Sequence, residues 1–102
     1  MVHIVCTFTV KEGKMEEYLA LSKELQKHVL KEKGCAEYTF MIEYKTPFSN
    51  QDEVNPNRVT LVEKWETEKD LAAHMDAPHM KEMGPKIRAL RESTSIRMMK
   101  AV

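Results

Sequence analysis

Two kinds of apolar periodicity alternate along this 102-residue chain, and their order limits the folds it can adopt. Alternation at every second position predicts strands over residues 2–9, 36–45, 58–66 and 93–101. Steps of three and four residues predict helices over residues 14–33, 71–75 and 78–90. The resulting order, β-α-β-β-α-β with the second helical region in two parts, predicts a ferredoxin-like α+β fold. In that fold a four-stranded antiparallel sheet carries its helices on one face.

The ends of the predicted helices are marked by particular residue types. Gly34 follows the first helix, where glycine commonly supplies a left-handed cap. Thr67 is a natural N-cap, with Asp70 three residues later, and Pro78 suits the first turn of the last helix. The pair Gly84-Pro85 predicts a kink or break in that helix. Residues 46–57 form a long polar loop, for which a surface connection and a functional role are both open.

Size and charge exclude several classes of protein. The length fits a single domain over residues 1–102, and sixteen basic residues balance sixteen acidic ones. A neutral chain has no electrostatic reason to bind nucleic acid or an anionic membrane. No apolar run approaches the roughly 18 residues of a membrane span, and residues 1–5 do not resemble a signal peptide. We therefore expect a soluble cytoplasmic protein in which Cys6 and Cys35 are reduced thiols.

Several predicted strands carry apolar residues on both faces. In the first strand, Ile4 and Cys6 point to one side and Val5 points to the other. Helices on one face of a sheet leave the second face uncovered. We therefore expect a homodimer whose two sheets pack face to face.

His74 and His79 are the histidines with the most suggestive surroundings. They are five residues apart with Pro78 between them, whereas two metal ligands on a helix normally stand four apart. No third ligand follows at a diagnostic spacing, so no metal site is expected. A structural role remains open for each histidine. With three glycines and no glycine-rich phosphate loop, nucleotide or flavin binding is not expected either.

Glu63 and Trp65 share one face of the third predicted strand. Trp65 fits two interpretations, a core residue and a flat wall against which a ring stacks. A carboxylate on that face is costly to bury unless it is paired or solvated, which places Glu63 at a sheet rim or in a wet cavity. A carboxylate beside a tryptophan and near His74 is a candidate general-base environment.

One block of the sequence carries a family resemblance. It comprises Glu63-Lys64-Trp65-Glu66-Thr67-Glu68, then Leu71, His74 and Pro78-His79-Met80-Lys81, with further likeness over residues 29–38 and 95–97. The block resembles the antibiotic biosynthesis monooxygenase family, and the likeness is greatest to its bacterial quinol monooxygenase branch. The resemblance implies a small dimeric α/β barrel, in agreement with the order of strands and helices.

The same resemblance implies an oxygenase that oxidises a small aromatic quinol, with O₂ as co-substrate and no metal or organic cofactor. His74 is then the base or proton relay, Glu63 orients it, and Trp65 is a ring wall and indole donor. His79 is assigned either to substrate contact or to capping. Phe40 and Met41, on opposite faces of their strand, are assigned as cavity walls, and which of them lines the cavity depends on which sheet face lies inside the barrel.

Three alternative functions are considered for a chain of this family pattern. Haem-degrading relatives carry an asparagine on the first strand, which this chain lacks, and His74 and Gly84 occupy the places of their tryptophan and histidine. The haem function is therefore disfavoured. Isomerases of a phosphorylated signalling metabolite keep a similar histidine pattern, and would need a cationic phosphate site. Lys81, Lys86 and Arg97 are the candidates for that site. A ligand-binding dimer without turnover is the third alternative.

Overall fold

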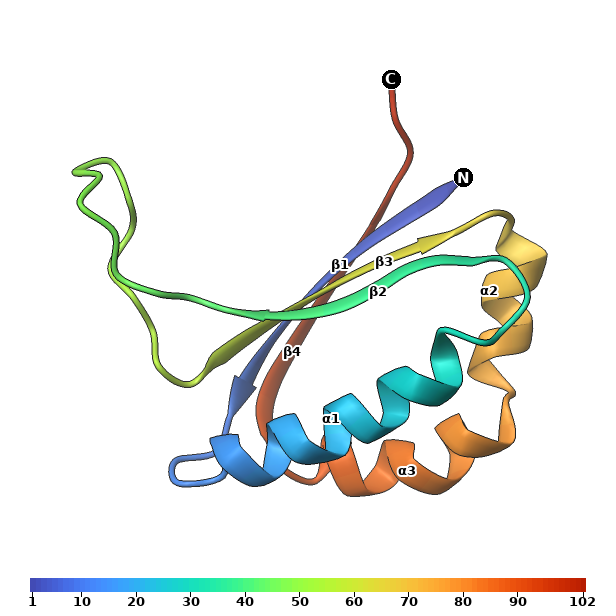
Figure 1. The fold of residues 1–102 in the computed structure, drawn as a ribbon, viewed down its shortest axis with the longest axis horizontal. Helices are drawn as coiled ribbons and strands as arrows, with labels where there is room; N and C mark the ends of the chain where they lie inside the picture. Colours follow the sequence, from blue (N-terminus) through green and yellow to red (C-terminus); the bar gives the residue numbers. More distant parts are fainter.

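The computed structural model describes residues 1–102. Its elements are β1 (Val2–Val10), α1 (Met15–Val29), β2 (Cys35–Ile42), β3 (Arg58–Trp65), α2 (Glu68–Met75), α3 (Pro78–Arg88) and β4 (Arg91–Met99). The strands form one antiparallel sheet in the order β2-β3-β1-β4. All three helices lie on one side of this sheet (Figure 1). The predicted ferredoxin-like α+β fold is confirmed.

The core lies between the sheet and α1. Alternate residues of β1 (Ile4, Cys6, Phe8 and Val10) are each at most 3% exposed, as the alternation predicted. They pack with buried residues of β3 and with Tyr18, Leu25 and Val29 of α1. None of the three helices has both the length and the apolar character needed to cross a membrane.

The first helix is shorter than its periodicity predicted. It ends at Val29, after which tight turns carry the chain to Gly34. Gly34 has a φ of +80°, and a Cβ atom there would collide with the carboxylate of Asp70. Its carbonyl also accepts a 2.8 Å hydrogen bond from the backbone of Glu66. The glycine therefore seats the loop after α1 against the start of α2, which brings Glu32 close to that helix.

The predicted starts of α2 and α3 are confirmed, but the predicted break at Gly84-Pro85 is wrong. Thr67 Oγ1 accepts a 3.0 Å hydrogen bond from the Asp70 amide, and Pro78 occupies the first turn of α3. The helix then continues through Pro85 to Arg88. Gly84 offers no Cβ for the proline ring to crowd, and Pro85 lies on the exposed side.

The segment between β2 and β3 projects away from the helices (Figure 1). At its base the Arg58 guanidinium donates two hydrogen bonds to the Glu43 carboxylate. Tyr44 and Phe48 are 74% and 70% exposed. This segment contributes no lining residue to the three main cavities of the structure. Within one chain it is a surface connection.

The Glu43–Arg58 pair predicts a response of stability to acid. Hydrogen bonding from Arg58 lowers the pKa of Glu43 from its ordinary 4.5 to about 2. A pKa that is lower in the folded state adds stability above the unfolded pKa, and this stability is lost as the pH falls through the folded pKa. We expect Glu43→Gln to lower the free energy of unfolding at pH 7, measured by urea unfolding, and to converge with the parent protein below about pH 2. A difference that does not change with pH would contradict this role.

Candidate active site

A mainly apolar cavity, open at its rim, lies between the sheet and α2. Its volume is about 160 Å³. Ten of its thirteen lining residues are hydrophobic, and the polar exceptions are Glu63, His74 and Arg91. An apolar protein cavity of roughly 150 Å³ accepts a benzene molecule. The cavity therefore has the size and lining for one aromatic ring.

His74 in the last turn of α2 lines this cavity and is 3% exposed. Its Nδ1 lies 2.8 Å from Oε2 of Glu32, and its Nε2 lies 4.0 Å from Oε1 of Glu63. A carboxylate oxygen only accepts hydrogen bonds, so the Nδ1 atom carries the proton. With its proton on Nδ1, the uncharged form of the ring has its lone pair on Nε2, the nitrogen nearer Glu63, and both residues line the cavity. The imidazole can accept a proton there.

Glu63 is buried, and its carboxylate has two hydrogen-bond donors. Oε1 accepts a 3.0 Å bond from the Trp65 indole, and Oε2 is 3.7 Å from the Cys6 sulfur. Burial and the nearby Glu63 charge raise the pKa of the Cys6 thiol to about 12, so the thiol stays protonated and donates. This pairing explains how the carboxylate is tolerated on an apolar face.

Trp65 packs against His74 and Glu63 but does not line the cavity. It is fully buried and does not appear among the cavity-lining residues. Its ring centroid lies 4.6 Å from that of His74, at an interplanar angle of 32°. The tryptophan therefore fixes the imidazole and holds Glu63, and it is a core residue.

Tyr38 and Arg91 add polar groups to the cavity. Burial raises the pKa of Tyr38, so its phenol stays neutral. The Arg91 guanidinium lies 3.7 Å from the Phe8 ring centroid and donates a 2.8 Å hydrogen bond to the Tyr18 hydroxyl. Arg91 is the one permanent cation among the lining residues. It is therefore the candidate donor to an oxygen of a bound ligand.

His79 also contacts Glu32. Its Nε2 lies 2.7 Å from the same Oε2 atom that His74 contacts, and the ligand-type atoms of all three residues lie within 4.8 Å. Tetrahedral zinc with bonds of 2.0–2.1 Å separates its ligand atoms by about 3.3 Å. The two observed contacts to Glu32, at 2.7 and 2.8 Å, have hydrogen-bond lengths instead. Glu32 is the third potential metal ligand, which the sequence spacing did not reveal. The two contact distances nevertheless fit N–H···O hydrogen bonds better than a metal site.

A family model for antibiotic biosynthesis monooxygenases matches residues 1–86. The chain belongs to the antibiotic biosynthesis monooxygenase family. Over 83 residues, 79% of each chain, it is 29% identical to the probable quinol monooxygenase YgiN of Escherichia coli K12.

Solved structures agree with this membership. A conserved protein from Methanosarcina mazei is 28% identical and superposes with a TM-score of 0.85, covering 99% of this chain and 92% of that one. A crystal structure described as an antibiotic biosynthesis monooxygenase is 21% identical, with a TM-score of 0.84 and coverage of 100% and 99%. The second likeness is evidence for the fold alone.

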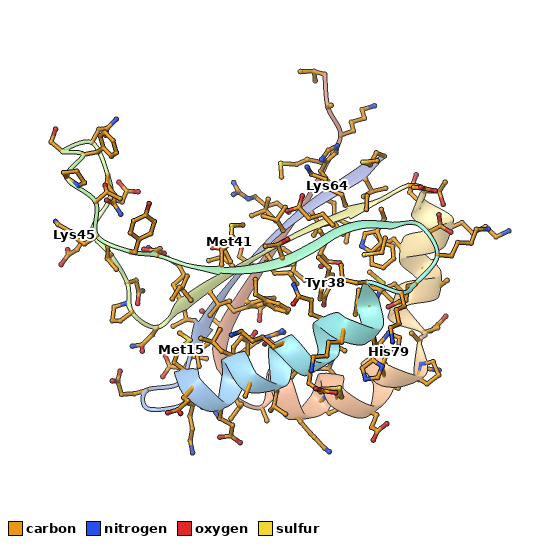
Figure 2. All side chains as sticks on the ribbon, viewed as in Figure 1. Met15, Tyr38, Met41, Lys45, Lys64 and His79 are labelled. Atoms are coloured by element: carbon orange, nitrogen blue, oxygen red, sulfur yellow. The ribbon has the colours of Figure 1, made fainter.

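This family member assembles only some of the residues that its sequence singled out. Glu63, Trp65 and His74 come together as predicted. Figure 2 shows Tyr38 on the helix side of β2 and Met41 on the opposite side, where Met41 is 42% exposed. Met41 therefore does not line the cavity, because neighbouring strand residues face opposite sides.

The other two predicted contact residues also lie outside the cavity lining. Phe40 packs edge-on against Tyr38, with centroids 5.5 Å apart, and lines a smaller pocket of about 70 Å³ beside the cavity. His79 lies in the first turn of α3 (Figure 2) and is turned toward Glu32. An open groove of about 710 Å³ adjoins the cavity and shares Leu71, Met75 and Met98 with it.

The cationic residues considered for a phosphate site are not gathered in this family member. Lys81 and Lys86 are exposed on α3. Arg97 pairs with Val5, which places it on the sheet face opposite the cavity. None of the three lines the cavity.

Sequence reasoning missed four residues of the site: Glu32, Cys6, Tyr38 and Arg91. Cys6 and Tyr38 had a usable signal, since each stands on the apolar face of a predicted strand. Glu32 lay in what looked like the charged end of a helix. Arg91 lay between predicted elements, so neither residue carried a periodic signal.

Proposed function

We propose that this protein is a cofactor-independent monooxygenase that oxidises a small aromatic quinol with O₂. One observation carries the proposal: a buried histidine, whose Nδ1 is bonded to Glu32, lines a ring-sized, mainly apolar cavity. Family membership and the 29% identity to a probable quinol monooxygenase support it.

The proposed chemistry begins with proton removal. An unperturbed phenol titrates near pH 10, so a quinol needs a base and a stabilising donor to ionise near neutral pH. His74 Nε2 takes the phenolic proton, and Arg91 stabilises the developing oxyanion. The apolar walls keep water from competing with O₂ for the ring.

The remaining steps balance without another reductant. The quinolate transfers one electron to O₂, and the two radicals combine to form a carbon–oxygen bond at the ring C–H next to the carbon that bears the ionised oxygen. His74 returns its proton to the peroxide, the ring carbon loses its hydrogen as a proton, and the O–O bond breaks. One quinol and one O₂ thus give one hydroxyquinone and one water.

No observation favours the isomerase alternative over this proposal. Its predicted cationic residues Lys81, Lys86 and Arg97 lie outside the cavity lining, and Arg91 alone offers a cation to a ligand. A ligand-binding dimer would use the same cavity without turnover, and the oxygen measurement below separates the two.

We also propose that the protein acts as a cytoplasmic homodimer. Large apolar side chains remain exposed along the sheet, including Met41, Ile42, Ile96, Met98 and Met99. Met41 and Met99 lie on the sheet face away from the helices, where a second sheet packed face to face would cover them, whereas Ile96 and Met98 line the rim of the cavity. Light scattering would then give twice the chain mass of 11.9 kDa.

The proposed cytoplasmic location fits the two cysteines, because both are free thiols and the cytoplasm keeps thiols reduced.

Oxygen uptake tests the proposed reaction. We expect the purified, chelator-treated protein to consume O₂ with a reduced naphthoquinol well above the uncatalysed rate, one O₂ for each quinol. An anaerobic sample should leave the quinol unchanged. Uptake equal to background across several one- and two-ring quinols would reject the proposal.

A further inference from the structure

We propose that Glu32 is a positioning residue that holds His74 with its proton on Nδ1, and that His79 holds Glu32 in place. This inference rests on the proposed use of His74 as a base. It gives roles to two side chains that the chemistry above leaves unused.

The contact between Glu32 and His74 links two distant parts of the chain. Glu32 follows α1 and His74 lies in α2, 42 positions later. Their side chains are 15% and 4% exposed, so water competes weakly for the 2.8 Å bond. The left-handed turn at Gly34 seats this loop against α2.

Glu32, and not Glu63, is placed to orient the imidazole. Glu63 was the predicted orienter, but its nearest oxygen is 4.0 Å from Nε2, beyond hydrogen-bond length. That oxygen already accepts the indole N–H of Trp65. The two carboxylates thus lie at different nitrogens of the imidazole. Glu32 accepts the Nδ1 proton, and Glu63 lies beside Nε2, on the side of the cavity.

A carboxylate on Nδ1 has two consequences for catalysis. It fixes the tautomer that leaves Nε2 free to accept a proton, and it stabilises the imidazolium that forms. Because the proton returns from His74 to the peroxide, the same dyad serves both steps. Nε2 on the cavity side is therefore able to accept a proton before the substrate binds.

His79 acts on Glu32 from the other side. Its Nε2 donates a 2.7 Å bond to the same oxygen, and its ring stacks on that of His28 at 5.5 Å. Two N–H groups directed at one oxygen keep the carboxylate from turning toward solvent. His79 is thus a clamp for Glu32.

Nitrogen NMR tests the tautomer without any substrate. In the parent protein, ¹⁵N-resolved spectra should show neutral His74 protonated on Nδ1. In Glu32→Met, which is similar in size but accepts no hydrogen bond, the proton should move to Nε2. Protonation on Nε2 in the parent, or on Nδ1 in the variant, would overturn the inference. If the variant does not fold, the parent spectrum still decides.

Kinetics with a quinol provide the second measurement. Glu32→Met should lower kcat about 10²-fold or more and leave KM nearly unchanged. Glu32→Asp should restore part of the loss, and His79→Ala should cost less than Glu32→Met. The matched control is Glu24→Met, on the exposed side of α1 beside Lys27 and His28, which should retain full activity. An equal loss in the control, or none in Glu32→Met, would contradict the role of Glu32.

Two further outcomes separate this inference from other accounts. Stoichiometric Zn²⁺ binding that disappears in Glu32→Met would replace the proton dyad with a metal site. Absence of oxygen uptake by the parent protein would reject the proposed function but leave the tautomer result standing. Failure of the two proposals is therefore distinguishable.

Discussion

Replacing His74 with glutamine is expected to lower kcat/KM for the quinol by about 10²–10⁴-fold, the usual contribution of a general base. With Nδ1 bonded to Glu32, the imidazole Nε2 is the nitrogen base available to the cavity, and glutamine has no basic nitrogen. Arg91 lines the same cavity but stays protonated. Oxygen uptake at varied quinol concentration measures the effect.

The control for this variant is the same substitution at His3. His3 lies on β1, paired with Lys64 and Met99, on the sheet face away from the cavity. His3→Gln should keep the activity of the parent protein. Undiminished oxygen uptake by a folded His74→Gln protein would remove His74 from the mechanism.

Replacing Trp65 with alanine is expected to lower the free energy of unfolding by about 3–5 kcal/mol. The side chain is fully buried, and its removal also leaves the buried Glu63 carboxylate without its indole donor. Urea unfolding measures the change. A loss below about 1 kcal/mol would contradict the assignment of Trp65 to the core.

Phenylalanine at position 65 separates packing from hydrogen bonding. It keeps much of the ring volume but has no N–H, so it should cost less stability than alanine. Because Trp65 does not line the cavity, Trp65→Phe should leave KM nearly unchanged. A large rise in KM would restore the hypothesis that Trp65 is a wall for the substrate.

The strands were predictable because burial repeats along them at every second residue. The buried residues of β1 and β3 alternate without a break, and the side chain of Thr67 caps α2 as its position indicated. These are local features, set by neighbours in the sequence. Their order along the chain was enough to specify the topology.

The missed features depend on contacts between distant residues. Gly34 approaches Asp70 across the fold in the loop that follows the early end of α1, and α3 continues through Pro85, which follows a glycine and is exposed. The bond from His74 to Glu32 joins positions 42 apart, and that from Cys6 to Glu63 joins positions 57 apart. Periodicity holds no information about such pairs. The sequence could therefore single out His74, Glu63 and the neighbouring Trp65, but not the distant partners Glu32 and Cys6.

The fate of the two oxygen atoms tests the central proposal most directly. A reduced naphthoquinol is supplied with ¹⁸O₂ and the metal-free protein, and the product is analysed by mass spectrometry. One ¹⁸O atom is expected in each hydroxyquinone, with one O₂ consumed for each quinol and the rate lost in His74→Gln. A product without ¹⁸O, or formed equally fast in the absence of O₂, would contradict the assignment of this protein as a quinol monooxygenase.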